Sequence, residues 1–230
     1  MRMRRKKNLE PRTARCEKVH ITEPQALKGK WEERFGRKGP LWLEIGCGKG
    51  RFVLQMAQHF PQVNFVAVER DPSALVIAME GAMELGLGNV LFLNQDAIAL
   101  ADVFDKDEVE RLFLNFSDPW PPNNRAKRRL THPNFLRVYA QFLCPGGSIH
   151  MKTDNQKLFE FSLNQFADFG LKLSQITFDL HKLPLFNVMT EYEERFSSQG
   201  LPIYRCVATF PGPVLPDPAP LSLEETKTEE

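Results

Sequence analysis

Residues 41–50 read LWLEIGCGKG, an apolar run followed at once by glycines in the spacing Gly-x-Gly-x-Gly. The run from Leu41 to Ile45 has the length of a short buried strand. Glycines after it allow a tight turn in which a ligand can approach the backbone closely. A dinucleotide-binding turn would have Gly-x-Gly-x-x-Gly, but Arg51 stands where its third glycine would be. The stretch therefore predicts a strand, a ligand-binding turn and the start of a helix, with a ligand other than a dinucleotide.

Strand-like and helix-like segments alternate along the chain outward from this turn. Further strand-like segments are found at 64–69, 89–94, 111–116, 148–152, 171–180 and 203–210. Segments with helical spacing of apolar residues separate most of them, including 158–169. Nearly unbroken apolar strands that alternate with helices are typical of a parallel sheet covered on both faces. We therefore expect a doubly wound α/β fold with a mostly parallel, seven-stranded sheet that ends in a C-terminal antiparallel hairpin.

The two ends of the chain differ in composition from this central part. Residues 1–18 contain eight Lys and Arg against two Glu, and residues 211–230 are rich in proline and then acidic. Such a tail cannot form a packed core, so we expect it to be disordered. The predicted organisation is a basic arm over 1–39, with a short helix near 24–35, one domain over 40–210, and the tail over 211–230.

Composition limits the classes of function. The formal net charge is +1, so overall charge indicates no partner. The basic arm and a basic run at 125–129 would suit a polyanion, although each could equally be a solvated surface. The four cysteines form no Cys-x-x-Cys pair, and no histidine stands at metal-ligand spacing. No signal peptide or apolar run of membrane-spanning length is present, so we expect a soluble, cytoplasmic protein without a metal site.

Acidic residues stand at or near the ends of four successive predicted strands. Glu44 lies in the first, Glu69 closes the second, and Asp96 and Asp118 follow the third and fourth. The carboxyl ends of parallel strands meet at one edge of a sheet, where a carboxylate after the second strand commonly binds ribose hydroxyls. Each carboxylate alone could be a helix N-cap. Four of them beside a glycine turn favour S-adenosylmethionine, a nucleoside with a cationic end. The predicted cofactor-binding residues are Glu44, Gly46, Gly48, Glu69, Asp96 and Asp118.

The segment NFSDPWP at 115–121 forms a stiff acidic and aromatic loop, because Pro119 keeps Asp118 out of helical geometry. At the mouth of a methyl-donor pocket such a loop could clamp a planar base. With this loop the sequence resembles the bacterial tRNA (guanine-N7-)-methyltransferase family. The matching stretches are LEIGCGKG, NFSDPWP, KRRLTHPNFL, GGSIHMKTDN and NVMTEYEERFSSQGLPIYR, in the family's order over about 40–210.

The resemblance implies a class I, Rossmann-like methyltransferase that uses S-adenosylmethionine on tRNA, at the variable-loop guanine of position 46. It implies that Asp118 is the catalytic residue. It also implies no metal and no obligatory protein partner. The implied nucleoside-binding residues are Asp154, Thr190, Glu191, Tyr192 and Glu193, and the implied tRNA contacts are Arg125, Lys127, Arg128 and Arg129. The chain departs from the family at Pro122, where a lysine assigned to substrate is usual, and Arg125 is the nearest candidate to replace it.

The chemistry of guanine N7 agrees with these residues. N7 carries an in-plane lone pair and no proton, so its methylation needs alignment and charge stabilisation rather than a strong base or a covalent intermediate. The sequence accordingly lacks an obvious Ser-His or Cys-His constellation. Two alternatives stay open: a methyltransferase acting on an exocyclic amino group, and a catalytically idle tRNA-binding module.

Overall fold

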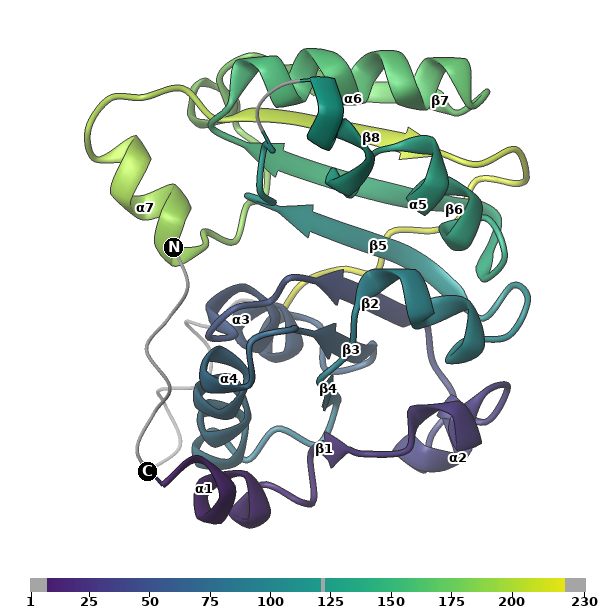
Figure 1. Ribbon diagram of the computed structural model, residues 1–230, viewed down its shortest axis with the longest axis vertical. Coiled ribbons are helices and arrows are strands. Elements are labelled where there is room, and N and C mark those ends of the chain that lie inside the picture. The colour runs from purple at the N-terminus through teal and green to yellow at the C-terminus, as the bar shows by residue number, and fades with distance from the viewer. Residues whose placement is uncertain (1–7, 121–122, 222–230) are drawn as a thin grey trace.

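The computed structural model describes residues 8–120 and 123–221 of the chain (Figure 1). Pro122 therefore lies outside the described residues, together with the first seven residues of the basic arm and the last nine of the tail. Within the described ranges, no helix is both long and apolar enough to cross a membrane.

The strands of the described chain form one eight-stranded sheet in the order β1-β4-β3-β2-β5-β6-β8-β7. Their bounds are β1 His20–Ile21, β2 Leu41–Ile45, β3 Asn64–Val68, β4 Val90–Leu93, β5 Val109–Asn115, β6 Leu143–Thr153, β7 Lys172–Thr177 and β8 Tyr204–Thr209. Neighbouring strands from β1 to β6 are parallel, and β8 is antiparallel to both β6 and β7. The predicted doubly wound α/β class is confirmed. The sheet has one strand more than expected, because the arm supplies β1, which pairs with β4.

The α-helices are α1 Leu9–Arg15, α2 Trp31–Phe35, α3 Arg51–His59, α4 Pro72–Glu84, α5 Pro133–Tyr139, α6 Gln156–Asp168 and α7 Glu191–Ser197. Short 3-10 helices are η1 Pro24–Leu27, η2 Ala97–Asp102, η3 Asn123–Arg128 and η4 Leu180–Lys182. Figure 1 shows α7 standing apart from the other helices, beyond the arrowheads of β5 and β6. That is the end of the sheet at which a ligand of a doubly wound fold binds.

The sheet separates two apolar cores, as alternation along β2 shows. Leu41, Leu43 and Ile45 pack with side chains of α5, α6 and η2, whereas Trp42 packs with side chains of α3 and α4. Successive side chains of a strand point to opposite faces, so an apolar strand of this kind needs cover on both sides. Glu44 shares the Trp42 face and is therefore buried although it is acidic.

The order of the strands creates a switch point between β2 and β5. From β2 the chain proceeds to β3 and β4 on one side, and it then returns to place β5 on the other side. Connections leave in opposite directions there, which opens a crevice beyond the carboxyl ends of the two strands. The Asn115 side chain at the end of β5 spans this point and donates a hydrogen bond of 2.9 Å to Glu44 Oε1.

The described part of the arm is packed on the domain. Trp31 is buried against Phe104 and donates from Nε1 to the Val103 carbonyl at 3.2 Å, while Arg12 of α1 pairs with Glu80 of α4. Only residues 1–7 of the predicted arm lie outside the described chain. The expected short helix near 24–35 is observed as η1 and α2.

The described part of the tail also makes contacts, which differs from the disorder expected for it. Leu221 exchanges hydrogen bonds with His59, and Arg111 donates to the Pro216 carbonyl and pairs with Asp217. Prolines hold the backbone extended and leave its carbonyls free to accept such bonds. A proline-rich composition therefore allowed docking here, up to residue 221.

Candidate active site

The glycine turn after β2 is held by the end of the neighbouring strand. The amides of Gly46 and Cys47 donate to the Val68 carbonyl at 2.8 and 3.1 Å. Gly46 and Gly48 have φ angles of 81° and 56°, which favour glycine, and a β-carbon on either would meet nothing within 4 Å. The turn thus presents bare backbone to open space at the switch point, as a ligand that approaches the main chain requires.

Glu44 is a buried carboxylate with one unused oxygen. Its side chain is 3% exposed, and Oε1 accepts the hydrogen bond from Asn115, whereas Oε2 has no donor among the described residues. Burial raises the pKa of Glu44 to about 7, against the opposing effect of the Asn115 hydrogen bond. A buried carboxylate that lacks a donor is suited to a cation from outside the chain.

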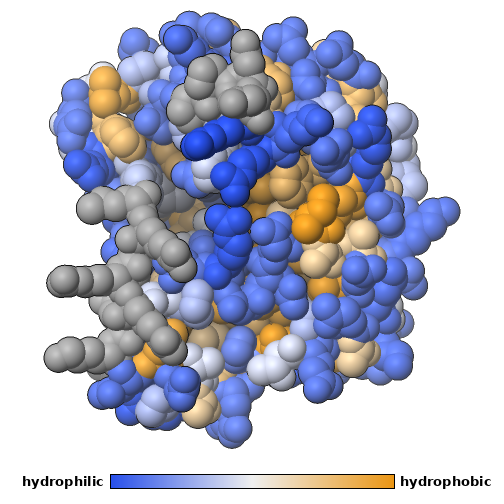
Figure 2. Space-filling model, in the orientation of Figure 1, coloured by the Kyte–Doolittle hydropathy of each residue, from blue (hydrophilic) through white to orange (hydrophobic). Residues whose placement is uncertain are grey.

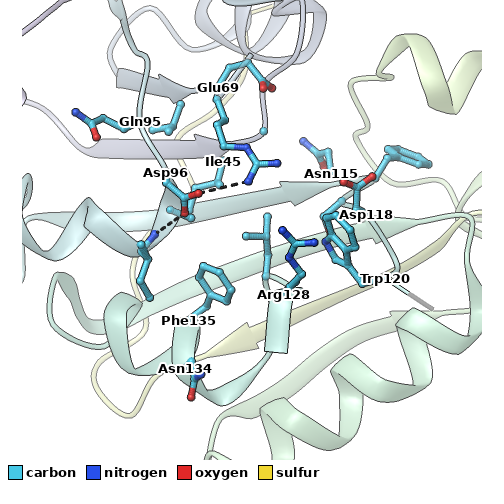
Figure 3. Close-up of a pocket in the computed structure, with 18 of the residues that line it drawn as sticks. Ile45, Glu69, Gln95, Asp96, Asn115, Asp118, Trp120, Arg128, Asn134 and Phe135 are labelled. Carbon is cyan, nitrogen blue, oxygen red and sulfur yellow. Dashed lines mark hydrogen bonds and ion pairs between the residues drawn. The ribbon is translucent and has the colours of Figure 1, made fainter. Parts of the chain in front are cut away.

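Glu69 and Asp96 follow the next two strands and are both oriented by backbone amides. The oxygens of Glu69 accept from Gly48 N at 3.0 Å and Asp71 N at 2.8 Å. Asp96 caps η2 through Ile98 N at 3.2 Å and lies 3.4 Å from Arg70 Nη1, as the dashed lines in Figure 3 show. Each carboxylate oxygen keeps a second lone pair for a ligand. The N-cap interpretation and the ligand interpretation therefore both fit Asp96.

A cavity of about 530 Å³ lies between these carboxylates and the loop after β5. Figure 3 shows Asp96 on one side, Asp118 and Trp120 on the other, and Arg128 beside Trp120. The cavity is lined by both polar and apolar residues. Its lining includes Ile45, Gly46, Glu69, Gln95, Asp96, Ile98, Asn115, Phe116, Asp118, Trp120, Lys127, Arg128, Leu130 and Phe135. Its apolar and carboxylate walls suit a nucleoside with its base and sugar side by side.

The Asp118 loop is held in an unusual backbone conformation. Phe116 and Trp120 have φ angles of 52° and 37°, in the left-handed region that side chains other than glycine rarely adopt. Arg129 holds the loop by donating to the carbonyls of Pro119 and Trp120 at 2.9 and 3.2 Å. Asp118 itself is exposed, and nothing in the described chain pairs with its carboxylate. A free acidic group is thus fixed at the wall of the cavity.

The basic run after this loop divides into two parts. Arg125, Lys127 and Arg128 are exposed, and the guanidinium carbon of Arg128 lies 4.3 Å from the centre of the Trp120 ring. Figure 2 shows strongly hydrophilic side chains gathered across the middle of the same view of the molecule. Arg129 instead turns inward, over the Phe161 ring at 4.4 Å. The geometry therefore gives Arg129 a loop-holding role, because its Nε and Nη2 donate to the loop, and its predicted phosphate contact stays a prediction.

A second cavity, of about 600 Å³, adjoins the first and shares Gly46, Glu69, Asn115 and Phe116 with its lining. Its wall is formed by the start of α7 on one side and the glycine turn on the other. Its lining includes Glu44, Gly48, Lys49, Arg51, Thr190, Glu191, Tyr192 and Arg195. Predicted cofactor residues and predicted nucleoside residues therefore line the same cavity, next to the first one.

Ion pairs hold α7 over this space. Lys49 Nζ lies 2.8 Å from Glu191 Oε2, and Arg51 pairs with Glu194. Thr190 caps the helix, since its Oγ1 accepts from Glu193 N at 3.0 Å. The glycine turn and α7 are more than 130 positions apart in sequence, and charges on both bring them together.

Glu193 is fully buried and bound by protein donors. Its Oε2 accepts from Lys152 Nζ at 2.6 Å, its Oε1 accepts from Asn187, and His181 Nε2 lies 3.3 Å from Oε1. Lys152 also donates to the Val188 carbonyl at 2.8 Å, and burial lowers the pKa of its ammonium. The geometry gives Glu193 the role of anchoring α7, which differs from the predicted substrate contact.

The remaining predicted residue, Asp154, lies after β6, is exposed and lines neither of these two cavities. Two residues that the sequence interpretation left unassigned, Asn115 and Lys152, hold Glu44 and Glu193. A lysine within the apolar run 148–152 was the available signal for the second. Among the described residues, no cluster of three or more His, Cys, Asp or Glu could hold a metal ion.

Comparisons with known proteins agree on one family. A family model described as putative methyltransferase matches residues 38–206. The chain is 50% identical over 191 residues to a tRNA (guanine-N(7)-)-methyltransferase of Brevibacillus brevis, which covers 82% of this chain and 89% of the relative. It is 46% identical over 206 residues to the enzyme of the same name from Bacillus subtilis, with 89% and 97% covered.

Among solved structures, the fold resembles the 16S rRNA methyltransferase KamB, with a TM-score of 0.60 and 18% identity over 80% of this chain and 93% of that one. At this identity the likeness supports the fold only.

Proposed function

The chain belongs to the bacterial tRNA (guanine-N7-)-methyltransferase family, and from this premise we propose how its residues divide the work of methylating a tRNA guanine. It is an enzyme that transfers a methyl group from S-adenosylmethionine to N7 of a guanine in tRNA. The observation that carries the assignment of roles is the pair of adjoining cavities at the switch point, lined by three strand-end acidic groups, the Asp118 loop and α7.

The residues around the glycine turn fit S-adenosylmethionine. The donorless Oε2 of Glu44 suits the ammonium of the methionine end, and the bare backbone of Gly46 and Gly48 leaves room for that end. Glu69 is aligned to accept from ribose hydroxyls, and Asp96 to accept from the adenine amino group. Water is excluded on one side by Ile45, Ile98, Leu130 and Phe135, which line the first cavity.

S-adenosylmethionine supplies a methyl group on a sulfonium: as a bond from N7 to the methyl carbon forms, the carbon–sulfur bond breaks and its electrons remain on sulfur. No proton leaves N7, so this chain needs no general base. Positive charge passes to the guanine ring, and a fixed carboxylate near the ring favours that change. We assign this role to Asp118, because its carboxylate is free and its loop is rigidly held.

The acceptor nucleoside would enter from the side of α7. Glu191 and Thr190 line the second cavity and provide acceptors for the N–H groups on the Watson–Crick edge of guanine. Lys127 and Arg128 line the first cavity, and Arg125 is exposed in the same 3-10 helix. These three residues would contact tRNA phosphates, which position the tRNA without reading its bases. We further propose the variable-loop guanine at tRNA position 46 as the acceptor, and the bacterial cytoplasm as the place of action.

The proposal is tested by product analysis. Purified chain, S-adenosylmethionine and an unmodified tRNA transcript should yield 7-methylguanosine on nucleoside mass spectrometry. A transcript with adenine at position 46 should yield none. A methyl group found on an exocyclic amino nitrogen would show instead that the chain is a methyltransferase acting on exocyclic amino groups. Retention of tRNA without any methylation would favour the idle binding module.

A further inference from the structure

Two aromatic rings with nearly parallel planes line the second cavity. Phe116, at the end of β5, and Tyr192, in α7, both line it; their ring centres are 6.5 Å apart and their planes are inclined by 21°. This separation is near the upper end of the roughly 4.5–7 Å found for paired rings. It is also close to twice the roughly 3.4 Å rise of stacked bases. A planar base stacked on both rings would need about this distance between their centres.

We propose that Phe116 and Tyr192 clamp the acceptor guanine between their rings and bind the methylated, positively charged ring more tightly than the neutral one. The inference rests on the proposed function, because it names positioning residues within that site.

Packing of the core does not fix the Tyr192 ring, which stacks on Phe196 of its own helix. Tyr192 is 58% exposed, unlike the aromatic residues of the core, and its hydroxyl has no partner in the described chain. Phe116 has a φ angle of 52°, a strained conformation for a residue other than glycine that concentrates at functional sites. That conformation is held by the amide of Phe116, which donates to the Lys152 carbonyl at 2.8 Å. The fold thus keeps one ring exposed and the other on a strained backbone.

Tyr192 is presented by a fixed support. The residue before it is tied to Lys49, and the residue after it is tied to Lys152 in a buried ion pair. Thr190 caps the helix that carries all three. Because the support is in place without substrate, little conformational freedom remains to be lost when a base enters, and binding is strengthened accordingly.

The clamp acts on the chemical step through charge. A cation is attracted to the face of an aromatic ring, and the guanine ring gains positive charge as N7 is methylated. Two ring faces therefore stabilise the transition state more than the bound substrate, which is the requirement for raising turnover and not only affinity. Asp118 follows Phe116 by two residues on the same loop and lines the adjoining first cavity.

The first test is the single-turnover rate at saturating tRNA and S-adenosylmethionine. Tyr192→Leu and Phe116→Leu should each lower it by about ten- to a hundred-fold, since stacking and cation–π terms on one base are of that order. Tyr192→Phe keeps the ring and should stay within about two-fold of the wild type. Phe196→Leu is the matched control, because Phe196 stacks on the outer side of Tyr192 at 6.3 Å and lines neither cavity.

Thermal unfolding of each variant confirms folding, and Tyr192 is exposed enough for its replacement to leave stability nearly unchanged. If the wild type forms 7-methylguanosine and Tyr192→Leu forms it at the wild-type rate, the clamp is refuted while the function stands. If the wild type forms none, the function itself fails.

A second readout separates charge from stacking. The Tyr192→Trp variant places a fluorescent indole in the clamp. At acidic pH, 7-methylguanosine monophosphate should quench its fluorescence at concentrations at least about ten-fold lower than guanosine monophosphate needs. The wild-type signal of the native tryptophans serves as the blank. In the double variant with Tyr192→Trp and Phe116→Leu, the preference for the methylated nucleotide should disappear. Equal response to the two nucleotides would overturn the charge-selective part of the proposal.

Discussion

At the ends of β2, β3 and β4 the site is made of backbone turns and carboxylates held by nearby amides. Beyond β5 and β6 it is made of segments far apart in sequence, joined by ion pairs. Glu69 is oriented by Gly48 and Asp71, whereas α7 is held by Lys49 and Lys152. The cofactor half is thus prepared by the fold itself. The acceptor half depends on a few long-range contacts, each of which one substitution can break.

The largest effect should come from Asp118, to which we assign a catalytic role in the acceptor half and whose carboxylate makes no structural contact in the described chain. Asp118→Ala should lower the methylation rate about 10²- to 10³-fold, the usual cost of removing one fixed electrostatic group. Because the carboxylate pairs with nothing in the described chain, the melting temperature and the retention of tRNA on a filter should not change. Near-normal turnover in this variant would reduce Asp118 to loop scaffolding.

The next effect concerns the contact on which the acceptor half depends. Lys152→Met leaves the fully buried Glu193 without its cation, which should cost about 3–5 kcal/mol of unfolding free energy. For a chain of this size the melting temperature should fall by roughly 6–20 °C. Lys49→Met breaks the exposed pair with Glu191 and should cost below about 1 kcal/mol. Equal losses in the two variants, measured by calorimetry, would contradict the distinction between anchor and surface pair.

In the cofactor half, we expect Glu44 to lower the stability of the fold while it strengthens the binding of S-adenosylmethionine. Burial raises its pKa from 4.5 to about 7, so the folded chain binds a proton more readily than the unfolded chain. Glu44 therefore costs stability as pH rises from 4.5 through 7, by about 3 kcal/mol once it is fully ionised. Glu44→Gln should raise the melting temperature of the cofactor-free protein at pH 8 and have little effect at pH 4.5.

Glu44→Gln should also weaken the binding of S-adenosylmethionine by about ten- to a hundred-fold at pH 8, because a hydrogen-bonded charge is lost. In the wild type, affinity should fall as pH drops below 7, since the cation must then displace a proton from Glu44. Titration calorimetry in buffers of different ionisation enthalpy measures that proton release. A wild-type affinity independent of pH between 6 and 8 would show that Glu44 does not bind the ammonium.

The same contrast explains what the sequence could predict. Apolar alternation and the glycine turn are local signals, so the fold class could be predicted from residues close together in the chain, and so could the positions of Glu44, Glu69 and Asp96 near the strand ends. The pairing of Lys152 with Glu193 spans 41 positions and leaves no local pattern, because one lysine in a strand resembles any other. The docking of the tail on His59 and Arg111 was missed for the same reason. Composition describes what a segment can do alone and not what a distant side chain offers it.

The smallest effects should separate the two parts of the basic run. Lys127 and Arg128 are exposed, so Lys127→Ala should weaken tRNA binding and lower the salt slope by about one unit, with turnover at saturating tRNA unchanged. Arg129 holds the Pro119 and Trp120 carbonyls, so Arg129→Ala should keep the salt slope and lower saturated turnover by about ten-fold, through a loosened Asp118 loop. Arg129→Lys tests the distinction further. It keeps the charge but loses the paired donors, and it should behave like the alanine variant in turnover. If Arg129→Ala instead lowers the salt slope and leaves turnover intact, the whole run binds phosphate, and the loop is held by its prolines alone.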